Sequence, residues 1–215
     1  MSACPSITGI RPFTASDFRE RARLHRSDEE TKEYGDHRLN PSLRELFLNQ
    51  KLRDAAVLIP VVDRGDEATV LLTQRSSSLR AHAGEVAFPG GRIDPGDPSP
   101  EAAALREAEE EIGLDASFVE IVGRLPYYHT GSGFRILPVL SVVRPDFLLT
   151  INQDEVEDAF EVPLSFLMDE KNHVRGSRIW QQKERFFFRM PYLQYNIWGV
   201  TAGIIRVLYE RLYHP

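Results

Sequence analysis

The sequence lacks the residues on which several classes of protein depend. Cys4 is the single cysteine among 215 residues, so an intrachain disulfide and a cysteine-based zinc site are both excluded. We therefore expect a reducing compartment, the cytoplasm. No apolar run approaches the roughly 18 residues of a membrane helix, and residues 1–10 lack the basic start and apolar core of a secretory signal. We expect no membrane partner.

An excess of basic charge is also missing. The chain has 26 Lys and Arg against 32 Asp and Glu, which gives a formal net charge of −6. Proteins that bind nucleic acid broadly carry a basic footprint, so we expect no nucleic-acid partner. An anionic small molecule held through a metal ion remains compatible with this charge. The length fits one domain with an extension better than two independent domains.

Residues 88–114 are the stretch in which the signals for chemistry gather. A glycine turn is followed by a turn-rich spacer and then by a helix with strong boundary signals. Asp97 and Ser99 offer capping oxygens, and Pro100 suits the first helical position. Gly113 is placed to end the helix in a left-handed conformation. The sequence therefore predicts a helix over 100–112.

Three carboxylates share one face of this predicted helix. Glu107, Glu110 and Glu111 are spaced i, i+3, i+4, and the opposite face is apolar, with Ala104, Leu105, Ala108 and Ile112. Like charges at these spacings cost a few tenths of a kcal/mol per pair, roughly, which favours a compensating cation. Carboxylate oxygens select a hard one, Mg²⁺ or Mn²⁺. A solvated helix face is the alternative interpretation, and for an isolated acidic run it is the commoner one.

Glycines followed by such an acidic helix resemble the Nudix box of the Nudix hydrolase family. The family pattern is a glycine, five residues, Glu, seven residues, and then Arg-Glu-apolar-any-Glu-Glu-any-Gly-apolar. Its second half is matched in full, by Arg106, Glu107, Ala108, Glu110, Glu111, Gly113 and Leu114. In the first half, the sixth residue after Gly91 is Asp97 instead of Glu, and eight residues separate it from Arg106. We therefore assign no role to Asp97.

Residues 71–91 are similar to a second signature, which precedes the Nudix box in coenzyme A pyrophosphatase-type members and reads roughly LLTxRSxxLRxHxGQVAFPGG. The matching residues are Arg75, Ser76, Leu79, Arg80, His82, Gly84, Val86, Ala87, Phe88, Pro89, Gly90 and Gly91, while Glu85 replaces Gln. Basic residues beside an acidic metal face are expected where a pyrophosphate is gripped from both sides. This gives five substrate-binding candidates, Arg75, Arg80, His82, Gly90 and Gly91. Solvated loop arginines and a structural histidine are the alternative.

The resemblance implies a division of roles among the acidic residues. The metal ion, Mg²⁺ or Mn²⁺, would be held by Gly91, Glu107, Glu110 and Glu111. Arg106 would orient a carboxylate, being one residue from Glu107. Glu111 and Glu155 are rival candidates for the residue that removes the proton from the attacking water. A structural charge is the alternative role of Glu155.

Hydrophobic patterns predict the remaining elements. Helices are predicted over 15–24, 163–168 and 196–212, with a short one after Asn40, and strands over 55–62, 69–73, 119–122, 136–143, 159–162, 179–182 and 185–190. Residues 64–66 form a hairpin turn. The stretch 126–135 is a candidate pocket lining, in which Tyr127, Tyr128 and Phe134 either stack on a base or pack in the core.

The resemblance implies an α/β (α+β) fold, a Nudix-type α-β-α sandwich with a mixed β-sheet. We predict an N-terminal helical extension over 1–50, packed on a Nudix hydrolase domain over 51–215. The implied reaction is metal-dependent hydrolysis of coenzyme A or acyl-coenzyme A to adenosine 3′,5′-bisphosphate and (acyl-)4′-phosphopantetheine. Another nucleotide-type small molecule, such as a sugar nucleotide or dinucleoside polyphosphate, and a non-catalytic binding module are the alternatives. The sequence leaves the oligomeric state open, with a homodimer as one option.

Overall fold

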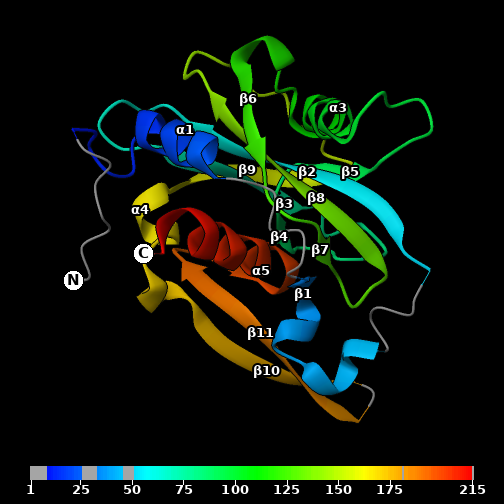
Figure 1. The fold of residues 1–215 in the computed structure, drawn as a ribbon. Helices are drawn as coiled ribbons and strands as arrows, with labels where there is room; N and C mark the ends of the chain where they lie inside the picture. Colours follow the sequence, from blue (N-terminus) through cyan, green and yellow to red (C-terminus); the bar gives the residue numbers. More distant parts are fainter. Residues whose placement is uncertain (1–8, 26–32, 46–50, 181, 215) are drawn as a thin grey trace.

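The structure is a computed structural model that describes residues 9–25, 33–45, 51–180 and 182–214 (Figure 1). Its α-helices are α1 (Ala15–Leu24), α3 (Pro100–Ile112), α4 (Leu164–Leu167) and α5 (Gly199–Leu208), the last continued by a π-helical turn η5 (Tyr209–Tyr213). Short 3-10 turns are η1 (Asp36–Arg38), η2 (Pro41–Leu43), η3 (Ala116–Phe118) and η4 (Glu170–Asn172). The strands are β1 (Tyr34–Gly35), β2 (Arg53–Val62), β3 (Thr69–Arg75), β4 (Val86–Ala87), β5 (Gly90–Arg92), β6 (Val119–Arg124), β7 (Tyr128–His129), β8 (Phe134–Val143), β9 (Val156–Pro163), β10 (Val174–Trp180), β11 (Lys183–Tyr192) and β12 (Tyr195–Trp198).

A mixed sheet is built around β2. It pairs in parallel with β8 along its whole length, and antiparallel with β3 and β5. Antiparallel neighbours extend the sheet on both sides, because β3 also pairs with β4 and β9, and β8 also pairs with β6 and β7. The predicted hairpin between β2 and β3 is confirmed. Strands β10, β11 and β12 form a separate antiparallel sheet.

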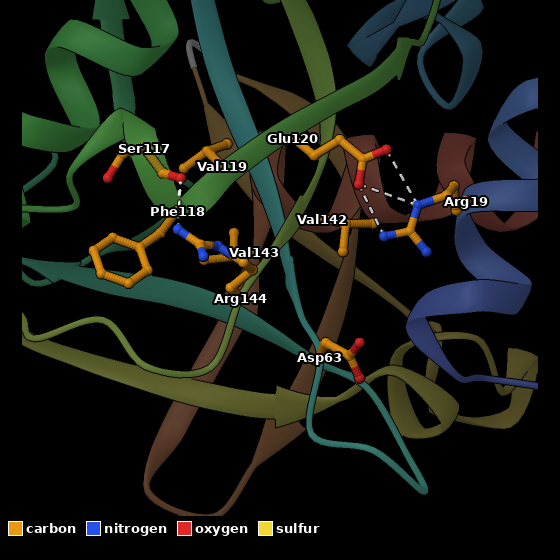
Figure 2. A pocket seen from close by; sticks show the side chains of 9 residues that line it. All are labelled: Arg19, Asp63, Ser117, Phe118, Val119, Glu120, Val142, Val143 and Arg144. Carbon is orange, nitrogen blue, oxygen red and sulfur yellow. Dashed lines mark hydrogen bonds and ion pairs between the residues drawn. The ribbon is translucent and has the colours of Figure 1, made fainter.

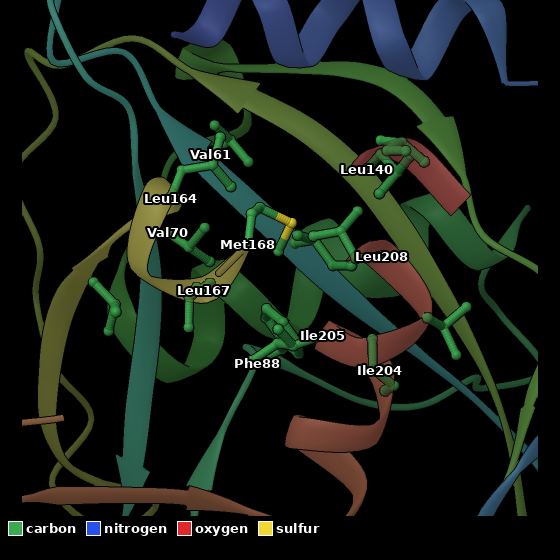
Figure 3. Close-up of a cluster of buried hydrophobic side chains, with 14 of the residues drawn as sticks. Val61, Val70, Phe88, Leu140, Leu164, Leu167, Met168, Ile204, Ile205 and Leu208 are labelled. Atoms are coloured by element: carbon green, nitrogen blue, oxygen red, sulfur yellow. The ribbon is translucent and has the colours of Figure 1, made fainter. Parts of the chain in front are cut away.

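Alternation along the strands sends side chains into two cores, one on each face of the mixed sheet. Leu58 of β2 lies in the cluster that receives Ala104, Ala108 and Ile112 of α3. Its neighbour Ile59 lies in the cluster that includes residues of α1, α4 and α5. Figure 3 shows this second cluster, in which residues of α4 and α5 surround Phe88 beneath the strands. The predicted sandwich of helices around a mixed sheet is confirmed.

The helix that carries the acidic face has the predicted boundaries. The Ser99 hydroxyl accepts a hydrogen bond from the Ala102 amide at 3.2 Å, and Gly113 has a left-handed φ of 69°. Of the two capping candidates, Ser99 is therefore the cap, and Asp97 makes other contacts. The apolar face is also confirmed, because Ala104, Ala108 and Ile112 are buried.

Several predicted boundaries were wrong because tertiary pairing overrode local pattern. The last helix begins at Gly199 instead of residue 196, since residues 195–198 pair with β11 as strand β12. The predicted glycine turn is strand β5, in which Gly90 and Gly91 pair with Val57 and Ala56. The short helix expected after Asn40 begins with the turn η2 and continues as α-helix at residues 44–45, and its further course over 46–50 lies outside the described residues.

The predicted N-terminal helix α1 is confirmed and contributes to the core. Phe18 is fully buried among residues of the mixed sheet and α5. The buried Asp17 carboxylate accepts from Arg21 Nε at 2.8 Å, and Arg21 Nη1 donates to the Leu212 carbonyl at 3.0 Å. This part of the predicted extension is thus tied to the end of the chain. The boundary near residue 50 stays a prediction.

In the described part of the chain, no helix combines the length and apolarity needed to cross a membrane.

Candidate active site

Strand β5 brings backbone against the acidic face of α3. Gly90 has a φ of +150°, and a Cβ on it would lie 2.4 Å from the Ala56 carbonyl oxygen. A Cβ on Gly91 would lie 2.4 Å from an oxygen of the Glu107 carboxylate. The Gly90 amide donates to Glu111 Oε2 at 3.2 Å. Only residues without side chains allow this close approach of strand to carboxylates.

The carboxylates at this junction are partly desolvated and repel one another. Glu111 is 3% exposed, and burial, reinforced by the charges of Glu107 and Glu155, raises its pKa to about 7. Burial also raises the pKa of Glu107, to which the charges of Glu110 and Glu155 contribute. Arg75 Nη1, at 3.8 Å from Glu111 Oε1, offsets the charge only in part. The predicted residues Glu107, Glu111 and Glu155 therefore share one electrostatic environment.

Arg106 binds the outer carboxylates. Its guanidinium lies 3.0 Å from Glu107 Oε1, 2.9 Å from Glu110 Oε2 and 3.0 Å from Asp97 Oδ1. It also donates to the Arg92 carbonyl at the end of β5. These contacts, with Asp97 first, raise the pKa of Arg106. Such a side chain is suited to orient carboxylates, as the resemblance implies.

Asp97 is a site residue that our sequence analysis left without a role. Its carboxylate receives both Nε and Nη2 of Arg106, each at 3.0 Å, and also accepts from the Asp94 amide. The sequence does keep a carboxylate in the spacer, but the extra residue between Asp97 and Arg106 breaks the family's spacing, so the motif gave Asp97 no role. A spacer folded into a turn can absorb one residue and still present the carboxylate to the helix.

The basic stretch before β5 lines a pocket beside these carboxylates. Four of the five substrate-binding candidates contribute to it, namely Arg75, His82, Gly90 and Gly91, and the pocket has a volume of about 260 Å³. Arg75 Nε is buried without a hydrogen-bond partner among the described residues. His82 pairs with Glu85 at 2.8 Å, a hydrogen bond that raises the pKa of the imidazole. Arg80 is exposed and is not part of the lining.

A sequence model described as the NUDIX domain matches residues 51–189. The chain belongs to the Nudix family. It is 40% identical over 206 residues to the uncharacterized Nudix hydrolase NudL of Escherichia coli strain K12, covering 92% of this chain and 94% of that protein. NudL of Shigella boydii serotype 4 is similar to the same extent. The solved structure of DR0079 from Deinococcus radiodurans matches 77% of this chain and 85% of its own, with a TM-score of 0.50 and 15% identity.

Membership of the Nudix family fixes the class of reaction and of substrate. The chain has the Nudix fold and is a hydrolase of diphosphate bonds, and Nudix enzymes bind nucleotide-type substrates. The expected α+β arrangement is thereby confirmed at the level of the family. Which diphosphate is cleaved is a separate question, since relatives within one fold differ in substrate.

The carboxylates of α3 supply the donor oxygens that a hard cation prefers, but in the described residues they are not arranged around one point. Among the described residues, no group of three or more Asp, Glu, His or Cys side chains is arranged to hold a metal ion. Glu110 is turned to Arg106, while Glu107 and Glu111 face β5. The donor oxygens and the surplus negative charge fit Mg²⁺ or Mn²⁺, the ions that such ligands prefer. The metal assignment stays a prediction.

The aromatic stretch 126–135 divides between pocket and core. Phe134 lines the pocket, with the Arg53 guanidinium 3.9 Å from its ring centre. Tyr128 is buried, and its hydroxyl donates to Asp36 Oδ1 at 2.9 Å. Tyr127 lies outside the pocket lining and under Arg135. Of the three aromatic candidates, only Phe134 is therefore positioned to contact a pocket ligand.

A second hollow contains none of the predicted site residues. It has a volume of about 150 Å³ and lies between α1, β6 and the ends of β2 and β8. Figure 2 shows the ion pair of Arg19 with Glu120, and Arg144 donating to the Ser117 carbonyl. Because the predicted site residues gather at the pocket beside α3 and none lines this hollow, the pocket beside α3 is the candidate active site.

Proposed function

We propose that this Nudix hydrolase cleaves the diphosphate linkage of coenzyme A or acyl-coenzyme A, giving adenosine 3′,5′-bisphosphate and (acyl-)4′-phosphopantetheine. One observation carries the proposal. The segment that resembles the coenzyme A pyrophosphatase signature forms a wall of the pocket, and its Arg75 lies 3.8 Å from the carboxylate of Glu111. A basic group and an acidic group thus meet where a diphosphate would enter.

Each residue has a role that its contacts support. Arg75 and His82 bind diphosphate oxygens from the pocket side, since charge-assisted hydrogen bonds to phosphate are strong. Arg106 holds Glu107 and Glu110 in place. When bound by the α3 carboxylates and the Gly91 backbone, Mg²⁺ or Mn²⁺ neutralises phosphate charge and lowers the pKa of the attacking water.

Glu111 and Glu155 remain the two candidates for the proton acceptor. The buried Glu111, with a pKa of about 7, has the basicity that suits a general base at neutral pH. Glu155 is less buried, and its carboxylate accepts a hydrogen bond from the side-chain amide of Asn152 at 3.4 Å. Both carboxylates lie close enough to interact, so removing either alters the other.

A substrate panel tests the assignment. We expect coenzyme A and acetyl-coenzyme A to be cleaved with a higher kcat/KM than a sugar nucleotide or a dinucleoside polyphosphate, at millimolar Mg²⁺. A preference for one of the other diphosphates would leave the reaction class unchanged but would contradict the assignment of coenzyme A as the substrate. Binding without any cleavage would instead favour a non-catalytic module.

Variants of α3 test the site. Glu110→Gln and Glu111→Gln should each lower kcat at least about 100-fold, because each removes charge needed around phosphorus. Glu109→Gln is the matched control, since Glu109 is exposed on the same helix and should leave kcat unchanged. Robust turnover by Glu110→Gln would show that Glu110 is not a metal ligand.

A further inference from the structure

The three-stranded sheet presents two unlike faces. Met190 of β11 and Ile197 of β12 are fully buried and belong to the core that contains α5. Because residues alternate along strands, the adjacent residues Arg189 of β11 and Trp198 of β12, which pair directly with each other, lie on the opposite face. Arg178 of β10 lies on this same face, with its guanidinium 4.9 Å from the centre of the Trp198 ring.

This face is cationic on an acidic protein. By the register of β10 and β11, its charged residues are Arg178, Lys183, Arg185 and Arg189, while the acidic Glu184 lies on the other face, opposite Ile179. Asp36 lies 3.5 Å from Arg185 and engages that charge. In the described part of the chain, neither Arg178 nor Arg189 forms an ion pair, and both are exposed. Arg178 therefore lies against the indole, and Arg189 extends from the same face at the position paired with Trp198.

Trp198 connects this face to the active-site pocket. The indole lines the same pocket as Arg75 and His82. Phe187 supports it with an edge contact at 5.3 Å between ring centres. The charge of Arg178 also acts on His82, whose pKa it lowers, which is consistent with a shared space. The pocket is thus lined both by Gly90 and Gly91, which lie against the α3 carboxylates, and by Trp198, against which Arg178 lies.

We propose that Arg178 and Arg189, on the sheet face that carries Trp198, form a second anion site that binds a phosphate monoester on the nucleoside portion of the substrate. The inference deepens the proposed function and rests on it, because coenzyme A carries such a group, the ribose 3′-phosphate, apart from its diphosphate. The pocket is also lined by apolar side chains such as Val57, Phe134 and Ile136, which suit the nucleoside.

Ligand binding to the metal-free full-length chain tests this site without any turnover. By titration calorimetry, adenosine 3′,5′-bisphosphate should bind at least about tenfold more tightly than adenosine 5′-monophosphate, as charge-assisted contacts to the extra phosphate imply. The double variant Arg178→Gln/Arg189→Gln should bind the two ligands equally. Arg175→Gln is the matched control, since Arg175 is exposed on the same strand but on its other face. Equal affinities in the wild type, or a preference that survives in the double variant, would overturn the proposal.

Kinetics then show whether the site serves the substrate. With coenzyme A, the double variant should lose about 10- to 100-fold in kcat/KM, mostly through KM, and should approach the rate of dephospho-coenzyme A. Its rate with dephospho-coenzyme A should be unchanged. An equal loss on both substrates would contradict a phosphate-specific role. If the wild type cleaves neither compound, the proposed function fails, and calorimetry still decides the anion site separately.

Discussion

At the scale of single residues, the site is defined by charge held out of water. Glu111 combines burial, two carboxylate neighbours and one distant arginine, and its pKa rises to about 7 as a result. Arg106 shows the opposite situation, since four carboxylates compete for one guanidinium. An acidic helix face and its basic neighbour are visible in the sequence. Which carboxylates are desolvated and which are paired depends on β5 and on the spacer.

The buried Glu111 should make stability of the metal-free protein fall as pH rises. Its pKa is about 7 in the folded chain, against a value of 4.5 when unperturbed. Folding therefore favours the protonated carboxyl, so its stabilising contribution is complete below about pH 4.5 and is lost as pH rises through 7. Between pH 5 and 8 the loss is about 2 to 3 kcal/mol.

Urea unfolding in EDTA at pH 5 and pH 8 measures this effect. Glu111→Gln removes the titrating group, so the variant should gain about 2 to 3 kcal/mol relative to the wild type between the two pH values. Glu109→Gln should follow the pH dependence of the wild type. A parallel pH dependence in Glu111→Gln and wild type would show that Glu111 titrates normally.

At the scale of elements, strand β5 is the piece that the sequence described least well. A pair of glycines predicts a turn from local propensity, whereas the structure uses them as a strand wedged between β2 and α3. The reason is close packing, because a Cβ on either glycine would clash with β2 or with Glu107, and Gly90 also has a positive φ. The helix α3 itself was predicted to the residue, since its cap, proline and terminal glycine are all local signals.

Replacing Gly90 by Ala should destabilise the protein and reduce activity. The new Cβ would meet the Ala56 carbonyl at 2.4 Å, and the φ of +150° is unfavourable for alanine. We expect a loss of about 3 kcal/mol or more in unfolding free energy from strain and overpacking together. Denaturant unfolding measures it, with Gly96→Ala as control, because nothing lies within 4 Å of a Cβ there. Equal stability of both variants would mean that β5 can move away from β2.

At the scale of the whole molecule, the N-terminal segment is joined to the domain through buried contacts. Asp17 is fully buried, accepts from the Phe13 amide at 3.0 Å and pairs with Arg21, which contacts the carbonyl of Leu212. The family match covers residues 51–189, so these contacts join two segments outside it, α1 and the turn η5 that contains Leu212. Helix α1 should therefore unfold together with the domain.

Removing this buried charge pair tests the coupling. Asp17→Ala leaves Arg21 without its buried carboxylate, which should cost about 3 to 5 kcal/mol of unfolding free energy in a single cooperative transition. Glu20→Ala is the control, because Glu20 pairs with Arg23 near the surface and should leave the midpoint unchanged. Two separate transitions in the wild type would instead identify residues 1–50 as an independent unit.

The sequence by itself determined helix α3, most strand positions, the acidic face and the family, because these follow from local periodicity, caps and a contiguous motif. Only the tertiary structure decided how distant segments meet. It paired residues 195–198 with β11, joined Asp97 to Arg106, left Arg80 outside the pocket lining, and brought Arg178 against Trp198, which lines the pocket. These outcomes depend on contacts between residues far apart in the chain, and such contacts leave no periodic pattern in the sequence.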